Sequence, residues 1–224
     1  MFFKTKSLIP LACLLVLIPA ISASHHNLSH DALQQGLQNR IQESLQWRSD
    51  RIDPQTNPDE GGLYDIAAKL ALGIDTEWAS QRLVEVLESP SGDMFWMFPV
   101  TAVAFLDQGQ LDEHADAALR RAWRTYMPQR GDTENHWIMY YVSIYLMAQL
   151  WPEHGPEDWF NGKSSAENMV EAREYINWWI NMTTSIGQGE YHSPHYLPEF
   201  MIMMAYLAAW AEEPDMRQRG RMML

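Results

Sequence analysis

Helical periodicity runs through almost the whole chain of 224 residues, and this feature most constrains the fold. In the first segment, over residues 28–46, an apolar residue recurs every fourth position. This stripe consists of Leu33, Leu37, Ile41 and Leu45. No segment shows the sustained apolar/polar alternation that is typical of strands. The sequence therefore predicts an all-α fold, and its length favours one domain over residues 24–224.

Two kinds of predicted helix alternate along the chain. Amphipathic segments cover residues 28–46, 75–88, 111–126 and 164–182, and segments that are apolar on nearly every side cover 61–72, 97–106, 134–151 and 195–210. A helix that is apolar all round must be covered all round. An inner row of apolar helices backed by amphipathic ones meets this demand. We therefore expect about four helical hairpins side by side, as an α/α toroid or partial toroid (arc), with an ordinary helical bundle as the alternative.

Local signals indicate where several of these helices begin. Pro99 would fit best at the first position of its helix, because proline there loses no hydrogen bond. The segment from Ser164 to Glu167 has the pattern of a capping box. Ser193 followed by Pro194 predicts the start of the last apolar helix.

The first 23 residues have the pattern of a secretory signal peptide. Lys4 and Lys6 precede an apolar stretch that is too short to span a bilayer, and small residues that end at Ala23 offer a cleavage site. The single cysteine, Cys13, would be removed with this segment, and lipoprotein processing at Cys13 is the weaker alternative. We expect a periplasmic or secreted protein that is not membrane-bound after cleavage.

Composition excludes one class of partner and favours another. The 29 acidic residues outnumber the 16 basic ones, for a formal charge of −13, which opposes binding to the phosphates of nucleic acid. The chain also carries 10 Trp and 9 Tyr, and these rings suit a cleft that stacks on sugars. We therefore expect a polysaccharide or oligosaccharide partner and no nucleic acid.

Polar, titratable residues mark the start of the apolar segment 134–151. With Asp132 or Thr133 as the N-cap, Glu134, Asn135 and His136 fall in the first helical turn, which would face the cavity of a toroid. A helix N-terminus favours bound anions and lowers the pKa of a nearby histidine, so His136 could act as a base. Alternatively, these residues only cap the helix and His136 belongs to the core.

A second polar cluster lies in the loop that precedes the last apolar helix. Titratable and aromatic side chains gather there, namely Glu190, Tyr191, His192, His195 and Tyr196. Loops held by a rigid scaffold often carry binding and catalysis, although a structural turn would also explain this composition. His192 and His195 could chelate a metal, but the sequence has no supporting carboxylate spacing, so we expect neither a metal nor another cofactor.

A run of arginines from Arg120 to Arg130 is a weaker feature. Most of it fits the solvated face of the helix at 111–126, but Arg130 could reach the cavity rim and meet an anion. Tyr140 lies one helical turn after His136 and is expected on the same face.

The Asn135-His136 pair at the start of an inner helix, followed by Tyr191 in a polar loop, resembles the Asn/His/Tyr arrangement of α/α-toroid polysaccharide lyases. Alginate lyases of the toroid type and the chondroitin and hyaluronate lyases are the families concerned. The resemblance implies β-elimination on a uronate-containing polysaccharide. It assigns neutralisation of the uronate carboxylate to Asn135, neutralisation or proton abstraction at C5 to His136, and proton transfer as base and acid to Tyr191, with Tyr196 as a second candidate.

The residues expected to contact substrate are Arg130, Glu134, Tyr140, Glu190, His192, His195 and Tyr196. Two other functions remain open. One is a toroid glycoside hydrolase in which Asp132, Glu134 and Glu190 supply the acid and base. The other is a sugar-binding protein without turnover, or a truncated form of a longer enzyme, since toroid lyases have more hairpins than this chain supplies. A partner chain could then complete the ring.

Overall fold

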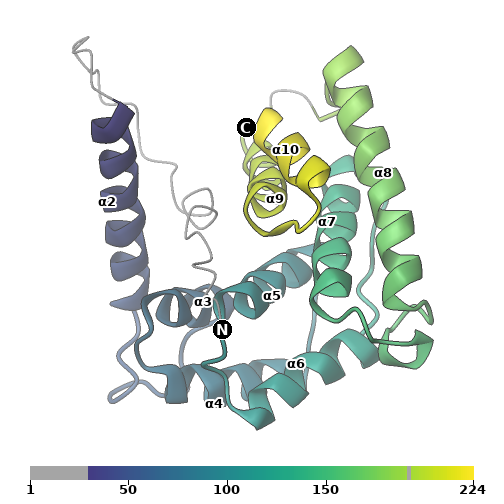
Figure 1. The fold of residues 1–224 in the computed structure, drawn as a ribbon. Helices are drawn as coiled ribbons and strands as arrows, with labels where there is room; N and C mark the ends of the chain where they lie inside the picture. Colours follow the sequence, from purple (N-terminus) through teal and green to yellow (C-terminus); the bar gives the residue numbers. More distant parts are fainter. Residues whose placement is uncertain (1–29, 191–192) are drawn as a thin grey trace, which may run out of the picture.

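The computed structural model describes residues 30–190 and 193–224, and this part of the chain is helical with no strand (Figure 1). The predicted signal peptide at 1–23 and two predicted site residues, Tyr191 and His192, lie outside the described residues. The described helices are α2 (His30–Ser49), α3 (Leu63–Leu72), α4 (Thr76–Glu88), α5 (Met94–Leu106), α6 (Glu113–Thr125), α7 (Glu134–Leu150), α8 (Ser165–Ile186), α9 (Leu197–Trp210) and α10 (Pro214–Met222), with a 3-10 turn, η1 (Pro156–Asp158), after α7. The all-α prediction is confirmed.

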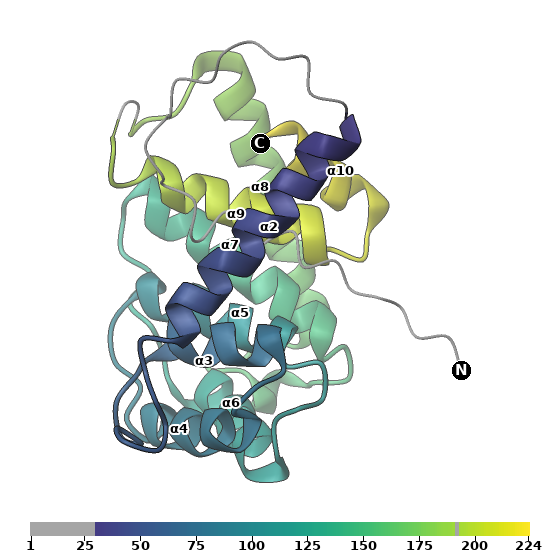
Figure 2. The same ribbon diagram turned by 90° about the vertical axis from the view of Figure 1, so that its left-hand side faces the viewer.

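The four apolar helices form a continuous inner row in the order α3, α5, α7, α9, in which each packs against the next. The remaining helices lie outside this row: α4 packs on α3, α6 packs beside α4, α8 packs on α7, and α10 packs on α9 (Figures 1 and 2). Helix α2 contacts α3 through its C-terminal half, where Ile41 and Leu45 are buried, and its N-terminal half projects away from the other helices (Figure 1). The helices of the inner row are buried over most of their length. No helix in the described ranges combines the length and apolarity needed to cross a membrane.

Helix α5 begins earlier than the sequence indicated. Asp93 is its N-cap, and the Asp93 side chain accepts a hydrogen bond from the amide of Phe95. Pro99 therefore lies inside the helix, and its predicted place at the first position is wrong. The first turn of α5 is apolar, so a cap placed just before it was overlooked.

The start of α9 also differs from the prediction. The helix begins at Leu197 with Pro198 in its first turn, not at Ser193-Pro194. The Ser193 hydroxyl does accept a hydrogen bond from the Tyr196 amide, but that bond closes a separate turn before the helix. By contrast, the capping box at Ser164 is confirmed.

Helix α10 was not anticipated, and it covers the inner helix α9 through a glycine contact. A Cβ atom added to Gly220 would lie 2.6 Å from the backbone nitrogen of Ala208 and 2.7 Å from the carbonyl oxygen of Met204. Only a residue without a side chain allows so close an approach between the two helices.

We expect Gly220→Ala to lower the free energy of unfolding by about 1–3 kcal/mol, because the added methyl group forces α10 away from α9. Gly36→Ala is the matched control: nothing lies within 4 Å of a Cβ at this position in α2, so the better helix propensity of alanine should raise stability by about 0.5–1 kcal/mol. Urea denaturation measures both changes. Equal stability of Gly220→Ala and the unmodified protein would contradict this packing.

Candidate functional site

The leading ends of inner helices α5 and α7 meet the loop that precedes α9. The Nε2 atom of His136, in the first turn of α7, lies 3.0 Å from a carboxylate oxygen of Asp93, the N-cap of α5. On the other side, the Asn135 amide donates a hydrogen bond to Glu190 over 2.9 Å. The two polar clusters that the sequence singled out are therefore in contact through their described residues.

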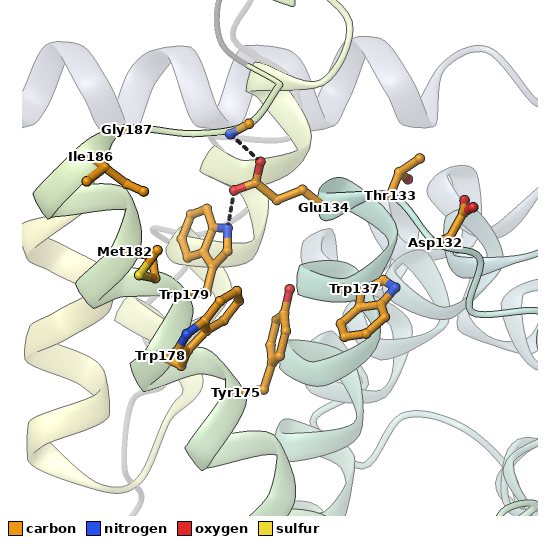
Figure 3. A pocket seen from close by; sticks show the side chains of 11 residues that line it. Asp132, Thr133, Glu134, Trp137, Tyr175, Trp178, Trp179, Met182, Ile186 and Gly187 are labelled. Carbon is orange, nitrogen blue, oxygen red and sulfur yellow. Dashed lines mark hydrogen bonds between the residues drawn. The ribbon is translucent and has the colours of Figure 1, made fainter.

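Two carboxylates hold the loop against α7, and each one binds the backbone of the other's segment. Glu134 accepts hydrogen bonds from the amides of Gly189 (2.7 Å) and Glu190 (3.2 Å) and from the indole of Trp179 (2.7 Å; Figure 3). Glu190 in turn accepts from the backbone amide of Asn135 and, at 3.4 Å, from its side-chain amide. We call this pair the carboxylate brace; the positive end of α7 further stabilises both charges.

Asn135 has no exposed surface. Its side-chain oxygen accepts a hydrogen bond of 2.8 Å from the Thr133 hydroxyl, and its NH₂ group points at Glu190. The amide is thus satisfied within the protein. A direct contact with a substrate carboxylate would require these hydrogen bonds to be exchanged.

His136 is held from both ring nitrogens. Asp93 contacts Nε2, and the Thr133 hydroxyl contacts Nδ1. The ring also meets the edge of Phe95, with 5.6 Å between the centroids, and the side chain is 19% exposed. The Asp93 carboxylate therefore orients the imidazole. Both ring nitrogens contact protein groups, and the Thr133 hydroxyl that meets Nδ1 donates its own proton to Asn135, so a substrate would have to displace one of these contacts before His136 acted as a base.

An aromatic groove of about 380 Å³ lies on the opposite side of this turn, between α7 and α8 (Figure 3). Its walls are large apolar and aromatic side chains, and its polar end is the start of α7. The lining residues are Asp132, Thr133, Glu134, Trp137, Tyr175, Trp178, Trp179, Met182, Ile186, Gly187 and Gly189. The indole of Trp179 is fixed by the brace, whereas Trp178 is 54% exposed.

Arg130 supports the wall of the groove from behind. Its guanidinium lies 4.1 Å from the ring centroid of Trp137 and donates a 2.9 Å hydrogen bond to the hydroxyl of Tyr141. The same group lies 5.8 Å from the ring of Tyr140, whose hydroxyl accepts from Asn161. Arg130 and Tyr140 are thus together, and the cation fixes the aromatic surface.

Two further predicted site residues lie outside the carboxylate brace and the aromatic groove. His195 and Tyr196 are exposed and precede α9. Within the ranges 30–190 and 193–224, no group of three or more His, Cys, Asp or Glu side chains is arranged to hold a metal ion.

The sequence interpretation missed Glu199, in the first turn of α9. Its side chain is partly buried, and its Oε2 atom is buried without a hydrogen-bond partner among the described residues. Burial raises the pKa of the Glu199 carboxyl to about 7, which suits a proton donor near neutral pH. Burial and the charge of Glu199 also raise the pKa of Tyr64, which lies beneath the guanidinium of Arg48 at 5.4 Å.

A row of aromatic rings connects this region with His136. Tyr64 in α3 meets Phe98 at 6.2 Å between centroids, Phe98 meets Phe95 at 6.2 Å, and Phe95 meets His136. The row runs across the inner helices α3, α5 and α7. The one signal for Glu199 was its position as the single acidic residue in the apolar segment 197–210.

No protein-family model matches this sequence, and no curated protein or solved structure is significantly similar to the chain. The functional argument therefore rests on the residues and their geometry.

Replacing Glu134 with alanine should lower the free energy of unfolding by about 1–3 kcal/mol, because three donors lose their acceptor. Hydrogen exchange at the amides of Gly189 and Glu190 should accelerate as the loop detaches. Glu43→Ala, at an exposed position in α2, is the control and should change stability by less than about 0.5 kcal/mol. Unchanged exchange at Gly189 would contradict the brace.

The pKa of Glu199 predicts a fall in stability with rising pH. In the folded protein the carboxyl keeps its proton up to about pH 7, whereas the unfolded chain releases it near the ordinary value of 4.5. The folded state binds more protons over this window, so the stabilisation present below about pH 4.5 is lost as pH rises through 7. Urea denaturation at pH 5 and pH 8 should show a smaller difference in Glu199→Gln than in the unmodified protein; an equal difference would contradict this assignment.

Proposed function

We propose that this chain is an exported, carbohydrate-active protein that binds a saccharide in the aromatic groove between α7 and α8. The observation that carries the proposal is the composition of the groove: Trp137, Tyr175, Trp178 and Trp179 stand around one cavity. Aromatic faces stack on the apolar faces of sugar rings, and the polar start of α7 supplies acceptors for hydroxyl groups. The volume of about 380 Å³ lies in the usual range of ligand sites.

For the architecture we propose an arc of helical hairpins, the partial toroid expected from the sequence. The support is the continuous packing of α3, α5, α7 and α9, with the other helices on the outside of this row. For the compartment we propose export to the periplasm or the medium. The support is the pattern of residues 1–23, which lie outside the described part of the chain.

For the reaction we propose β-elimination on a uronate-containing polysaccharide. His136 does not line the groove, so the polysaccharide would extend from the groove past the start of α7 to reach it. There His136, oriented by Asp93, would remove the proton at C5, the bond from C4 to its oxygen would break, and Tyr191 would return a proton to that oxygen. The N-terminal end of α7 would favour the uronate carboxylate. Asn135 would act indirectly, by fixing Thr133 and Glu190, because its amide is buried and hydrogen-bonded.

Hydrolysis of a glycosidic bond is the second candidate, and Glu199 is the observation that favours it. A carboxyl that keeps its proton near pH 7 is what a general acid requires. Of the three acids considered from the sequence, Glu134 and Glu190 are committed to the carboxylate brace, whereas Asp132 lines the aromatic groove.

Trp178→Ala should weaken saccharide binding by about tenfold or more, because the exposed indole is a stacking surface of the groove. Trp47→Ala is the control, since Trp47 is 60% exposed but lies on α2, outside the groove. Calorimetric titration with alginate, hyaluronate and neutral oligosaccharides measures the affinity. If both variants bind as the unmodified protein does, or none of these sugars binds, the groove is not the saccharide site.

Product analysis separates the two reactions. Elimination forms an unsaturated uronate that absorbs in the ultraviolet, and His136→Ala or Tyr191→Phe should abolish it while binding persists. Hydrolysis releases reducing ends without this absorbance, and Glu199→Gln should abolish that activity. Binding without either product would leave a sugar-binding protein.

A further inference from the structure

A second cavity of about 380 Å³ opens at the other end of α7, against the outer face of α6. Three arginines on two neighbouring turns of α6 line it: Arg120, Arg121 and Arg124. His154, in the segment after α7, and Asp158, in η1, complete its polar lining. Since α7 is about 25 Å long, this cavity is well separated from the aromatic groove at the start of the helix.

One of the three guanidiniums is fixed in place. Arg120 lies 4.9 Å from the ring centroid of Trp151 and donates a 2.7 Å hydrogen bond to Nε2 of His154. It also pairs with Asp116 at 2.9 Å and lies 3.7 Å from a carboxylate oxygen of Glu153. The histidine is itself stacked on Trp151 with 5.1 Å between centroids. This wall of the cavity is therefore preorganised.

The other two guanidiniums are free to bind a ligand. Arg121 and Arg124 are exposed, and neither forms an ion pair within the described part of the chain. The carboxylate of Asp158 is directed to the amide of Gly155 at 3.1 Å. Arg121 and Arg124 are thus two unpaired positive charges beside one cavity, in a protein with a formal charge of −13.

We propose that this cavity is a binding site for a phosphate or sulfate monoester. A carboxylate is satisfied by the fork of a single arginine, whereas two unpaired guanidiniums beside a third suit a tetrahedral oxyanion with three free oxygens, whose charge is −1 in a sulfate monoester and near −2 in a phosphate monoester. Arg120 positions one face of the oxyanion, and Arg121 and Arg124 close on it from α6. The cavity is larger than an inorganic ion needs, so the organic part of the ester occupies the remaining space.

Isothermal titration calorimetry in about 0.15 M NaCl tests the site, because this salt concentration screens diffuse surface attraction. The probes are inorganic phosphate, inorganic sulfate, glucose 6-phosphate and glucose. We expect both ions to bind, glucose 6-phosphate to bind more tightly than phosphate, and the Arg121→Ala/Arg124→Ala double variant to bind each anion at least tenfold more weakly.

The charge-matched control is Arg40→Ala/Arg221→Ala, which removes two exposed arginines from α2 and α10. It should bind the anions as the unmodified protein does, and urea denaturation should show that both double variants fold. The proposal is overturned if neither phosphate nor sulfate binds, or if the two double variants lose the same amount of anion affinity. Glucose 6-phosphate binding no tighter than phosphate overturns the ester assignment. The titration with glucose alone measures binding of the sugar without the phosphate, so it tests the saccharide proposal separately from the anion site.

Discussion

The carboxylate brace at the start of α7 is the interaction on which the rest of this region depends. Glu134 and Glu190 bind each other's backbone segments, so the loop before α9 and the first turn of α7 are fixed together. Neither anion is left unpaired, because backbone amides, an indole and the helix N-terminus all stabilise them. Without this mutual binding, the polar loop would have no fixed position against a helix that is otherwise apolar.

The brace also divides the first turn of α7 into two surfaces. His136 faces α5 and is oriented by Asp93, while Glu134 and Trp137 face α8 and the aromatic groove. Asn135 lies between these surfaces and is buried. Neighbouring residues in the sequence therefore serve different sides of the helix, and a polar cluster on the first turn is not by itself one reaction centre.

Periodicity was sufficient to predict the helices from α2 to α9 and their alternation, because an all-round apolar segment such as α7 can only lie inside the fold. It did not predict α10. The first residues of α5 and α9 were harder to predict, because each segment contains two residues that are typical of a helix start. Pro99 and Pro194 each fit a first position, but Asp93 caps α5 and Pro198 lies in the first turn of α9. Proline fits the first turn of a helix, as Pro198 does, but it can also lie inside one, as Pro99 does in α5, so a proline alone does not define where a helix begins.

The candidate site was partly predictable, for a similar physical reason. The sequence identified the segments around Asn135 and Glu190, because polar residues beside an apolar helix are unusual. It could not show that their side chains bind one another, since this depends on contacts between segments far apart in the chain. Glu199 was missed because its raised pKa arises from burial, which only the folded packing of α9 creates.

Asp93 has a consequence for how this region can be studied. One carboxylate both caps α5, through the amide of Phe95, and orients the imidazole of His136. Substituting His136 leaves the helix cap in place, whereas substituting Asp93 removes the cap and the imidazole's support together. A substitution of His136 therefore tests the role of the imidazole without removing the helix cap. A substitution of Asp93 changes the cap and the imidazole together, so its effect on activity cannot be distinguished from its effect on folding.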